Sequence, residues 1–75
     1  MLDKVKQVVS ATTGISLADV RDDASAESIE TWDSATQINI VAAVEEEFGV
    51  RFTDDELVAA ISIPAIIGVL KRLSP

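Results

Sequence analysis

Apolar residues recur at intervals of three and four along most of the chain, which is the spacing of one helix face. This pattern predicts a first helix over about Leu2–Thr12, a second over Ser34–Phe48, a short third over about Asp54–Ala60, and a fourth that begins after Ser62. No run alternates cleanly enough to predict a strand. We therefore expect an all-α fold, a small bundle of three main helices and one short helix, with a long loop between the first two helices.

Residues that favour helix ends stand at these boundaries. Gly14 and Gly49 follow the first and second helices, where glycine suits a left-handed C-terminal cap. Thr53 and Glu56 fit the capping box of the third helix, and Ser62 can cap the fourth. The helix ends are thus predicted from short-range signals alone.

The second helix divides into two arcs when its residues are placed about 100° apart. One arc is apolar and is expected to face the core: Ile38, Ile40, Val41, Val44 and Phe48. The other carries small or polar residues that a partner protein could contact: Ala35, Thr36, Asn39, Ala42, Ala43, Glu46 and Glu47. Because the loop Ile15–Asp33 is too long to lack all structure in so small a chain, we expect one helical turn after Ser16 and four residues that pin the loop to the core: Ile15, Leu17, Val20 and Ile29.

Composition and charge restrict the class of protein. The 75 residues suit one domain over residues 1–75, and 13 acidic against 6 basic residues give a formal net charge of −7. Such a charge disfavours nucleic acid and favours basic partners. The longest apolar run contains Pro64 and Gly68 and is too short to span a membrane. Charges at Asp3, Lys4 and Lys6 break up any apolar region of a secretory signal. Because the chain also lacks cysteine and a long heptad seam, we expect a cytoplasmic monomer.

The available side chains argue against catalysis. The chain has no histidine and no cysteine, so the usual general base, thiol nucleophile and zinc ligands are missing. The acidic segment that starts at Asp22 lacks the glycine of a calcium loop, and the three glycines lie too far apart to cradle a phosphate. We expect no metal site, no catalytic residue and no enzyme activity.

Ser34 stands behind Asp33 at the start of the second helix. An Asp-Ser pair in this position is by itself typical of an ordinary helix cap. A serine at a helix N-terminus also lies near unpaired backbone N–H groups and the positive end of the helix dipole, which stabilise a phosphate. If Asp33 caps the helix, the Ser34 hydroxyl is free to react.

The stretch WDSATQINIVAAVEEEFGVRFTDDEL resembles the core of an acyl carrier protein. An Asp-Ser pair that opens the second helix, the run Glu45–Gly49 and the acidic start Asp54–Glu56 stand at that family's intervals, and the likeness extends over essentially the whole chain. It implies that a phosphopantetheinyl transferase joins 4′-phosphopantetheine from coenzyme A to Ser34, beside Asp33. Acyl groups would then travel as thioesters to partner enzymes of fatty acid, polyketide or specialised biosynthesis.

The same resemblance implies partners and a place for the cargo. The partners are the transferase, a loading ligase, and acyltransferase or synthase enzymes with basic docking patches. An acyl chain would enter between the second helix and its neighbours, although each candidate lining residue also suits an ordinary core: Ile38, Val41, Phe48, Ile61 and Ile66.

Several positions depart from the family pattern. Carriers of fatty acid synthesis usually have leucine after the serine and acidic residues two and five positions after it, where this chain has Ala35, Thr36 and Asn39. We expect an altered choice of partner. Trp32 replaces a small aliphatic residue and either packs in the core or lies beside the arm. These features resemble stand-alone carriers of specialised pathways.

Two other functions fit the sequence. An aminoacyl- or peptidyl-type carrier would use the same arm for a different cargo. An acidic helical interaction module would carry no prosthetic group, and Ser34 would then be only a cap. The mass of the modified serine separates these functions.

Overall fold

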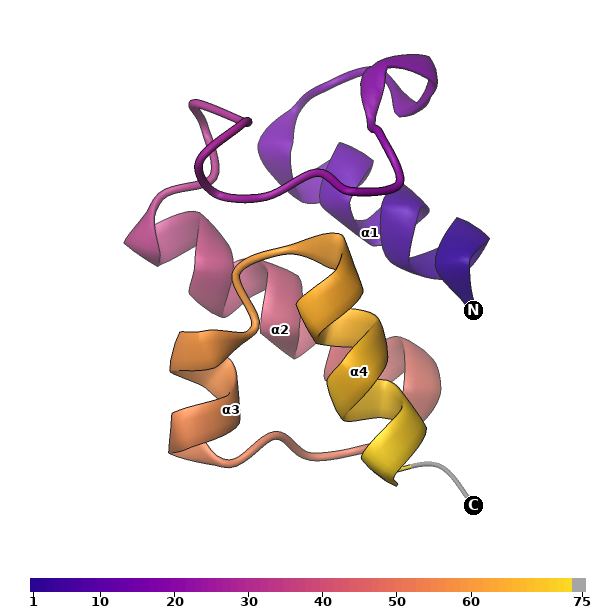
Figure 1. Ribbon diagram of the computed structural model, residues 1–75, viewed down its shortest axis with the longest axis vertical. Helices are drawn as coiled ribbons and strands as arrows, with labels where there is room; N and C mark the ends of the chain where they lie inside the picture. Colours follow the sequence, from indigo (N-terminus) through magenta and orange to yellow (C-terminus); the bar gives the residue numbers. More distant parts are fainter. Residues whose placement is uncertain (74–75) are drawn as a thin grey trace.

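The computed structural model describes residues 1–73 and shows a bundle of helices joined by a long loop (Figure 1). Its elements are α1 (Leu2–Thr13), the 3₁₀ turn η1 (Leu17–Asp19), α2 (Ser34–Phe48), α3 (Asp54–Ala59) and α4 (Ile63–Leu73). No strand occurs within residues 1–73, where one isolated bridge joins Ser25 and Ser62. The predicted all-α architecture, including its one short helix and its long loop, is confirmed.

The helix ends form where the capping residues stand. Gly14 and Gly49 adopt positive φ angles of 81° and 67° after α1 and α2, a conformation that favours glycine. The Thr53 hydroxyl accepts the Glu56 backbone N–H at 3.1 Å, and the Glu56 carboxylate accepts the Thr53 backbone N–H at 2.8 Å. Ser62 accepts a backbone N–H from the first turn of α4 at 3.1 Å. The predicted caps are confirmed.

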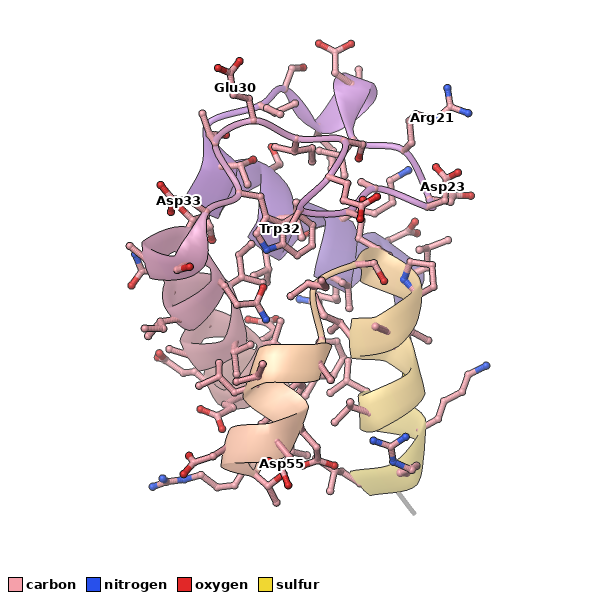
Figure 2. All side chains as sticks on the ribbon, turned by 60° about the vertical axis from the view of Figure 1, so that its left-hand side comes forward. Arg21, Asp23, Glu30, Trp32, Asp33 and Asp55 are labelled. Atoms are coloured by element: carbon pink, nitrogen blue, oxygen red, sulfur yellow. The ribbon has the colours of Figure 1, made fainter. Side chains whose placement is uncertain are left out.

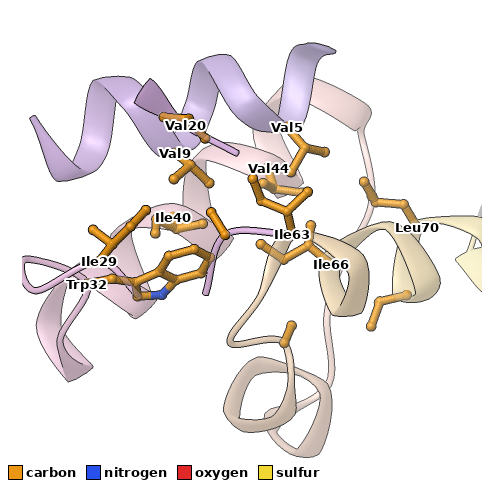
Figure 3. Close-up of a cluster of buried hydrophobic side chains, with 13 residues drawn as sticks. Val5, Val9, Val20, Ile29, Trp32, Ile40, Val44, Ile63, Ile66 and Leu70 are labelled. Carbon is orange, nitrogen blue, oxygen red and sulfur yellow. The ribbon is translucent and has the colours of Figure 1, made fainter. Parts of the chain in front are cut away.

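The core lies between α1, α2 and α4, and α1 packs against both of the others. Figure 3 shows Trp32 beside Ile29 and Ile40 in this cluster. The short helix α3 has no buried residue of its own, although Ala60, its C-cap, is fully buried. The core residues come from α1, the long loop, α2, the C-cap of α3 and α4: Val5, Val9, Val20, Ala24, Ile29, Trp32, Ile40, Val44, Ala60, Ile63, Ile66, Val69 and Leu70.

The long loop is held against the core as expected, with one exception. Val20 and Ile29 are buried, and Ile15 packs partly against the core. The predicted turn after Ser16 is η1, but all three of its residues are exposed, and Leu17 keeps 46% of its surface accessible. The expectation that Leu17 pins the loop to the core was wrong, because Leu17 lies on the exposed turn η1, and Ile15, Val20 and Ile29 make the contacts with the core.

Backbone hydrogen bonds fix the far end of the same loop. The N–H of Ala26 donates to the carbonyl of Ile61 at 2.9 Å, and the N–H of Ile63 donates to the carbonyl of Ala24 at 2.8 Å. These bonds join the loop to the segment between α3 and α4. In Figure 1 the loop accordingly runs across the upper end of α1 and approaches the start of α4. No helix within residues 1–73 is both long and apolar enough to cross a membrane.

The buried face of α2 differs from the predicted one at two adjacent residues. Ile40, Val41 and Val44 are buried, and Phe48 packs partly against the core, as predicted. Ile38 is instead 58% exposed, and Gln37 is only 7% exposed. At about 100° per residue, Gln37 lies in the middle of the buried arc of α2, and Ile38 lies about 100° around the helix from Gln37. The prediction that Ile38 faces the core was wrong because Ile38 lies outside the arc that Gln37, Ile40, Val41 and Val44 form on the helix.

Candidate functional site

Ser34 is the first residue of α2, and its side chain is exposed to solvent. Asp33, the residue before it, is the N-cap: its Oδ1 accepts the Thr36 backbone N–H at 2.9 Å. Within residues 1–73 no hydrogen bond engages the Ser34 hydroxyl. Figure 2 shows Asp33 pointing outward at the start of α2, whereas Trp32 points into the interior. Capping is therefore the task of Asp33, and the Ser34 hydroxyl is available to a reagent.

The charge around Ser34 follows from this cap. The backbone hydrogen bond from Thr36, with a further contribution from the Thr36 side chain, holds the pKa of the Asp33 carboxyl below its ordinary value. Asp33 is thus ionised at neutral pH and faces the positive end of the α2 dipole. The backbone N–H groups of a first helical turn are the groups that stabilise a phosphate. An anionic group on Ser34 would meet these N–H groups.

A surface hollow of about 410 Å³ opens beside Ser34, between α2 and α3. The side chains around it are mostly apolar, and several of them are exposed. They come from the loop, from α2, from α3 and from the segment after α3: Ala26, Trp32, Asp33, Ser34, Gln37, Ile38, Leu57, Val58 and Ile61. The hollow therefore offers apolar surface next to Ser34.

The predicted acyl-lining residues are divided between this hollow and the core. Ile38 and Ile61 border the hollow. Val41 and Ile66 are buried inside the bundle, and Phe48 packs against the core at the other end of α2. The structure therefore does not bring the five together. Whether any of them contacts an acyl chain stays a prediction.

Gln37 is the residue of the site that the sequence analysis missed. Its Nε2 donates to the carbonyls of Leu57 and Ala60 at 2.8 and 2.9 Å, and its Oε1 accepts the Trp32 Nε1–H at 2.6 Å. Trp32 is buried in the core, the first of its two predicted positions, and it also borders the hollow. That it lies beside the arm stays a prediction. The burial of Gln37 could have been inferred from its spacing of three, four and seven residues from Ile40, Val41 and Val44. Its polarity argued against that inference.

The predicted partner-contact residues lie on two parts of the α2 surface. Ala35, Asn39, Ala42 and Glu46 are exposed and form one strip, which we call the outer strip. The other three lie nearer to α1 or are partly covered: Thr36, Ala43 and Glu47. Contact of either group with a partner stays a prediction.

The three consecutive glutamates at the end of α2 have different surroundings. Glu45 accepts the backbone N–H of Phe52 at 2.7 Å and so holds the loop that leads to α3. Glu47 pairs with Lys4 of α1 at 2.7 Å. Glu46 lies on the outer strip, where no ion pair within residues 1–73 engages it. The acidic run therefore offers a partner less charge than its sequence suggests.

A small helical bundle that presents a free serine at a helix start, beside an apolar hollow, has the features of a carrier of covalently attached groups. Residues 3–70 match the family described as "Phosphopantetheine attachment site". Over 57 residues the chain is 33% identical to a protein named "Acyl carrier protein" from Acidothermus cellulolyticus, covering 76% of this chain and 68% of that relative. The chain belongs to the acyl carrier protein family. Proteins of this family carry 4′-phosphopantetheine covalently and are carriers, not enzymes.

Proposed function

We propose that Ser34 is the attachment point of 4′-phosphopantetheine and that the chain carries acyl groups as thioesters for fatty acid, polyketide or specialised biosynthesis. The observation that carries this proposal is the exposed Ser34 hydroxyl at the start of α2. This hydroxyl is not needed as a cap, because Asp33 caps the helix. The positive end of the helix dipole suits the phosphodiester that would form there. The apolar hollow beside Ser34 suits the carried group. The residues at the head of α2 therefore fit the prosthetic group.

The attachment reaction needs a second protein. The Ser34 oxygen forms a bond to the phosphorus of the phosphopantetheine moiety, the pyrophosphate bond of coenzyme A breaks, and adenosine 3′,5′-bisphosphate leaves. The serine proton must pass to a base, and this chain has no histidine or cysteine to accept it. A phosphopantetheinyl transferase with Mg²⁺ supplies that chemistry. Once bound, the group provides the thiol that the sequence lacks.

The partner enzymes in this proposal are the transferase, a loading ligase, and acyltransferases or synthases, all acting in the cytoplasm. The net charge of −7 would steer basic docking patches toward the carrier. On the outer strip only Glu46 is charged, beside Ala35, Asn39 and Ala42. Charge would thus mainly raise the rate of encounter, whereas the neutral residues would decide which partner fits.

Modification of the purified protein tests the attachment site. Incubation with coenzyme A, Mg²⁺ and a promiscuous phosphopantetheinyl transferase should add the mass of one phosphopantetheine to the wild type and none to Ser34→Ala. Ser16→Ala is the matched control, because Ser16 is also exposed and its side chain caps nothing. It should be modified like the wild type. Modification of Ser34→Ala, or an unchanged wild-type mass with several transferases, would refute the proposal.

A further inference from the structure

One buried polar side chain, that of Gln37, lines the hollow beside Ser34. Both hydrogen-bonding ends of its amide are occupied. The Nε2 atom donates to the carbonyls of Leu57 and Ala60, and the Oε1 atom accepts the Trp32 indole N–H. Within residues 1–73 no buried side-chain nitrogen or oxygen is left without a partner. The buried part of the lining, Trp32 and Gln37, is therefore a complete hydrogen-bonded network.

This network also determines where α3 lies. The last carbonyls of a helix have no partner within the helix, and Gln37 satisfies two of those at the end of α3. Because α3 contributes no buried residue of its own, apolar packing holds it only weakly. The Gln37 amide thus joins α3 to α2 in the wall of the hollow that faces the core. Ala60, which accepts one of the bonds, already belongs to the core.

We propose that the network of Gln37, Trp32 and the end of α3 closes the hollow to longer acyl chains, so that this carrier holds short acyl groups at its surface and does not take a long chain into the bundle. The proposal rests on the attachment at Ser34 proposed above. A longer chain would have to displace the Gln37 amide. Its methylenes could not accept the indole N–H or donate to the two carbonyls, and buried polar groups without partners are unfavourable.

Several side chains that border the hollow are partly exposed to solvent, which suits an acyl group that is short or stays near the surface. Ile38 from α2, Val58 from α3 and Ile61 after α3 are 58%, 73% and 44% exposed. An acyl group that lay between these three side chains would replace the water that now contacts them. Additional methylenes beyond these residues would find only the closed network or the solvent. Gln37 is therefore the residue that limits how much of an acyl chain is protected.

Thioester cleavage measures this limit directly. The protein is loaded from butanoyl-, octanoyl- and dodecanoyl-coenzyme A, and cleavage by hydroxylamine is followed by intact mass. In the wild type, octanoyl and dodecanoyl groups should be cleaved at rates within about twofold of each other, since no further methylene is buried. The emission of Trp32, the single tryptophan of the chain, should also be the same for both cargoes. A dodecanoyl group cleaved about tenfold more slowly, the effect of roughly two additional buried methylenes, would overturn the proposal.

Substitution assigns the limit to Gln37. Gln37→Leu keeps the approximate size of the side chain but removes its hydrogen bonds, and should slow dodecanoyl cleavage at least about tenfold relative to octanoyl. Val5→Ala is the control, because Val5 is a fully buried residue of α1 that does not border the hollow. It should loosen the bundle without creating a dependence on chain length.

A second variant covers the case in which Gln37→Leu does not fold. Trp32→Phe keeps an aromatic ring in the core and removes the indole N–H that Gln37 accepts, together with part of the indole ring system. It should change the dependence on chain length in the same direction by a smaller factor. Length-independent cleavage in the folded variants would overturn the role of Gln37. Failure of Ser34 to accept any group would instead overturn the proposed function, and the limit on cargo with it.

Discussion

Replacing Gln37 with leucine removes three hydrogen bonds from the interior of the protein. The indole N–H of Trp32 and the carbonyl of Ala60 would then be buried without partners, at about 1–3 kcal/mol each. The carbonyl of Leu57 is only partly buried, so water can replace the lost bond at little cost. The additional apolar surface of leucine offsets about 1 kcal/mol. We expect a net loss of about 3 kcal/mol in the free energy of unfolding.

This loss is large for so small a protein. At about 0.05–0.15 kcal/mol per residue, a chain of 75 residues has a total stability of roughly 4–11 kcal/mol. For domains of this size, 1 kcal/mol corresponds to about 4–8 °C in Tm. The Tm of Gln37→Leu should therefore fall by more than about 10 °C. Urea denaturation followed by far-ultraviolet circular dichroism measures the difference without depending on the surroundings of Trp32.

Ile38→Ala is the matched comparison, because the hydrophobic pattern and the tertiary structure predict opposite results for the two positions. If Ile38 were a core residue, its truncation would cost about 2–5 kcal/mol. Since it is 58% exposed, we expect a change within about 0.5 kcal/mol. A larger loss of stability in Ile38→Ala than in Gln37→Leu would refute the assignment of Gln37 to the core and of Ile38 to the surface.

Two further predictions concern the helix caps. The hydrogen bonds from Thr36 lower the pKa of Asp33, so its stabilising effect is complete above the ordinary carboxyl pKa of about 3.9 and is lost as the pH falls through the lowered folded value. Asp33→Asn keeps an acceptor oxygen but cannot titrate, so the wild type should lose its advantage over this variant as acid denaturation proceeds below the ordinary carboxyl pKa. An equal acid dependence in both proteins would contradict this reasoning. Thr53→Ala removes the hydroxyl half of the α3 capping box and should lower the free energy of unfolding by about 1 kcal/mol in urea denaturation, whereas an unchanged midpoint would show that the cap contributes nothing.

Most of the fold was predictable because its signals act over a few residues. Gly14 and Gly49 adopt the left-handed conformation that glycine favours, and Thr53 and Glu56 bond to each other's backbone. The cap at Asp33 likewise depends only on the first turn of α2. Such interactions form wherever the helix itself forms. The number of helices, their order and their ends could thus be inferred before any packing was known.

The predictions that failed all depended on burial. Leu17 is apolar but lies on an exposed turn, and Ile38 is apolar but lies outside the buried arc of α2. Gln37 is polar but buried, because Trp32 and the end of α3 provide partners for its amide. Hydropathy cannot show whether such partners exist. They come from residues that only packing brings together.

The sequence by itself determined that a serine follows a capping aspartate at the start of an amphipathic helix, in a chain without histidine or cysteine. These facts are local, and together with the family pattern they direct attention to Ser34. Tertiary structure alone decided what surrounds Ser34. It pairs Glu47 with Lys4, places Ile38 and Ile61 on the walls of a hollow, and lines the same hollow with the buried Gln37. These contacts join segments far apart in the chain, so they depend on how the helices pack and not on the helical periodicity.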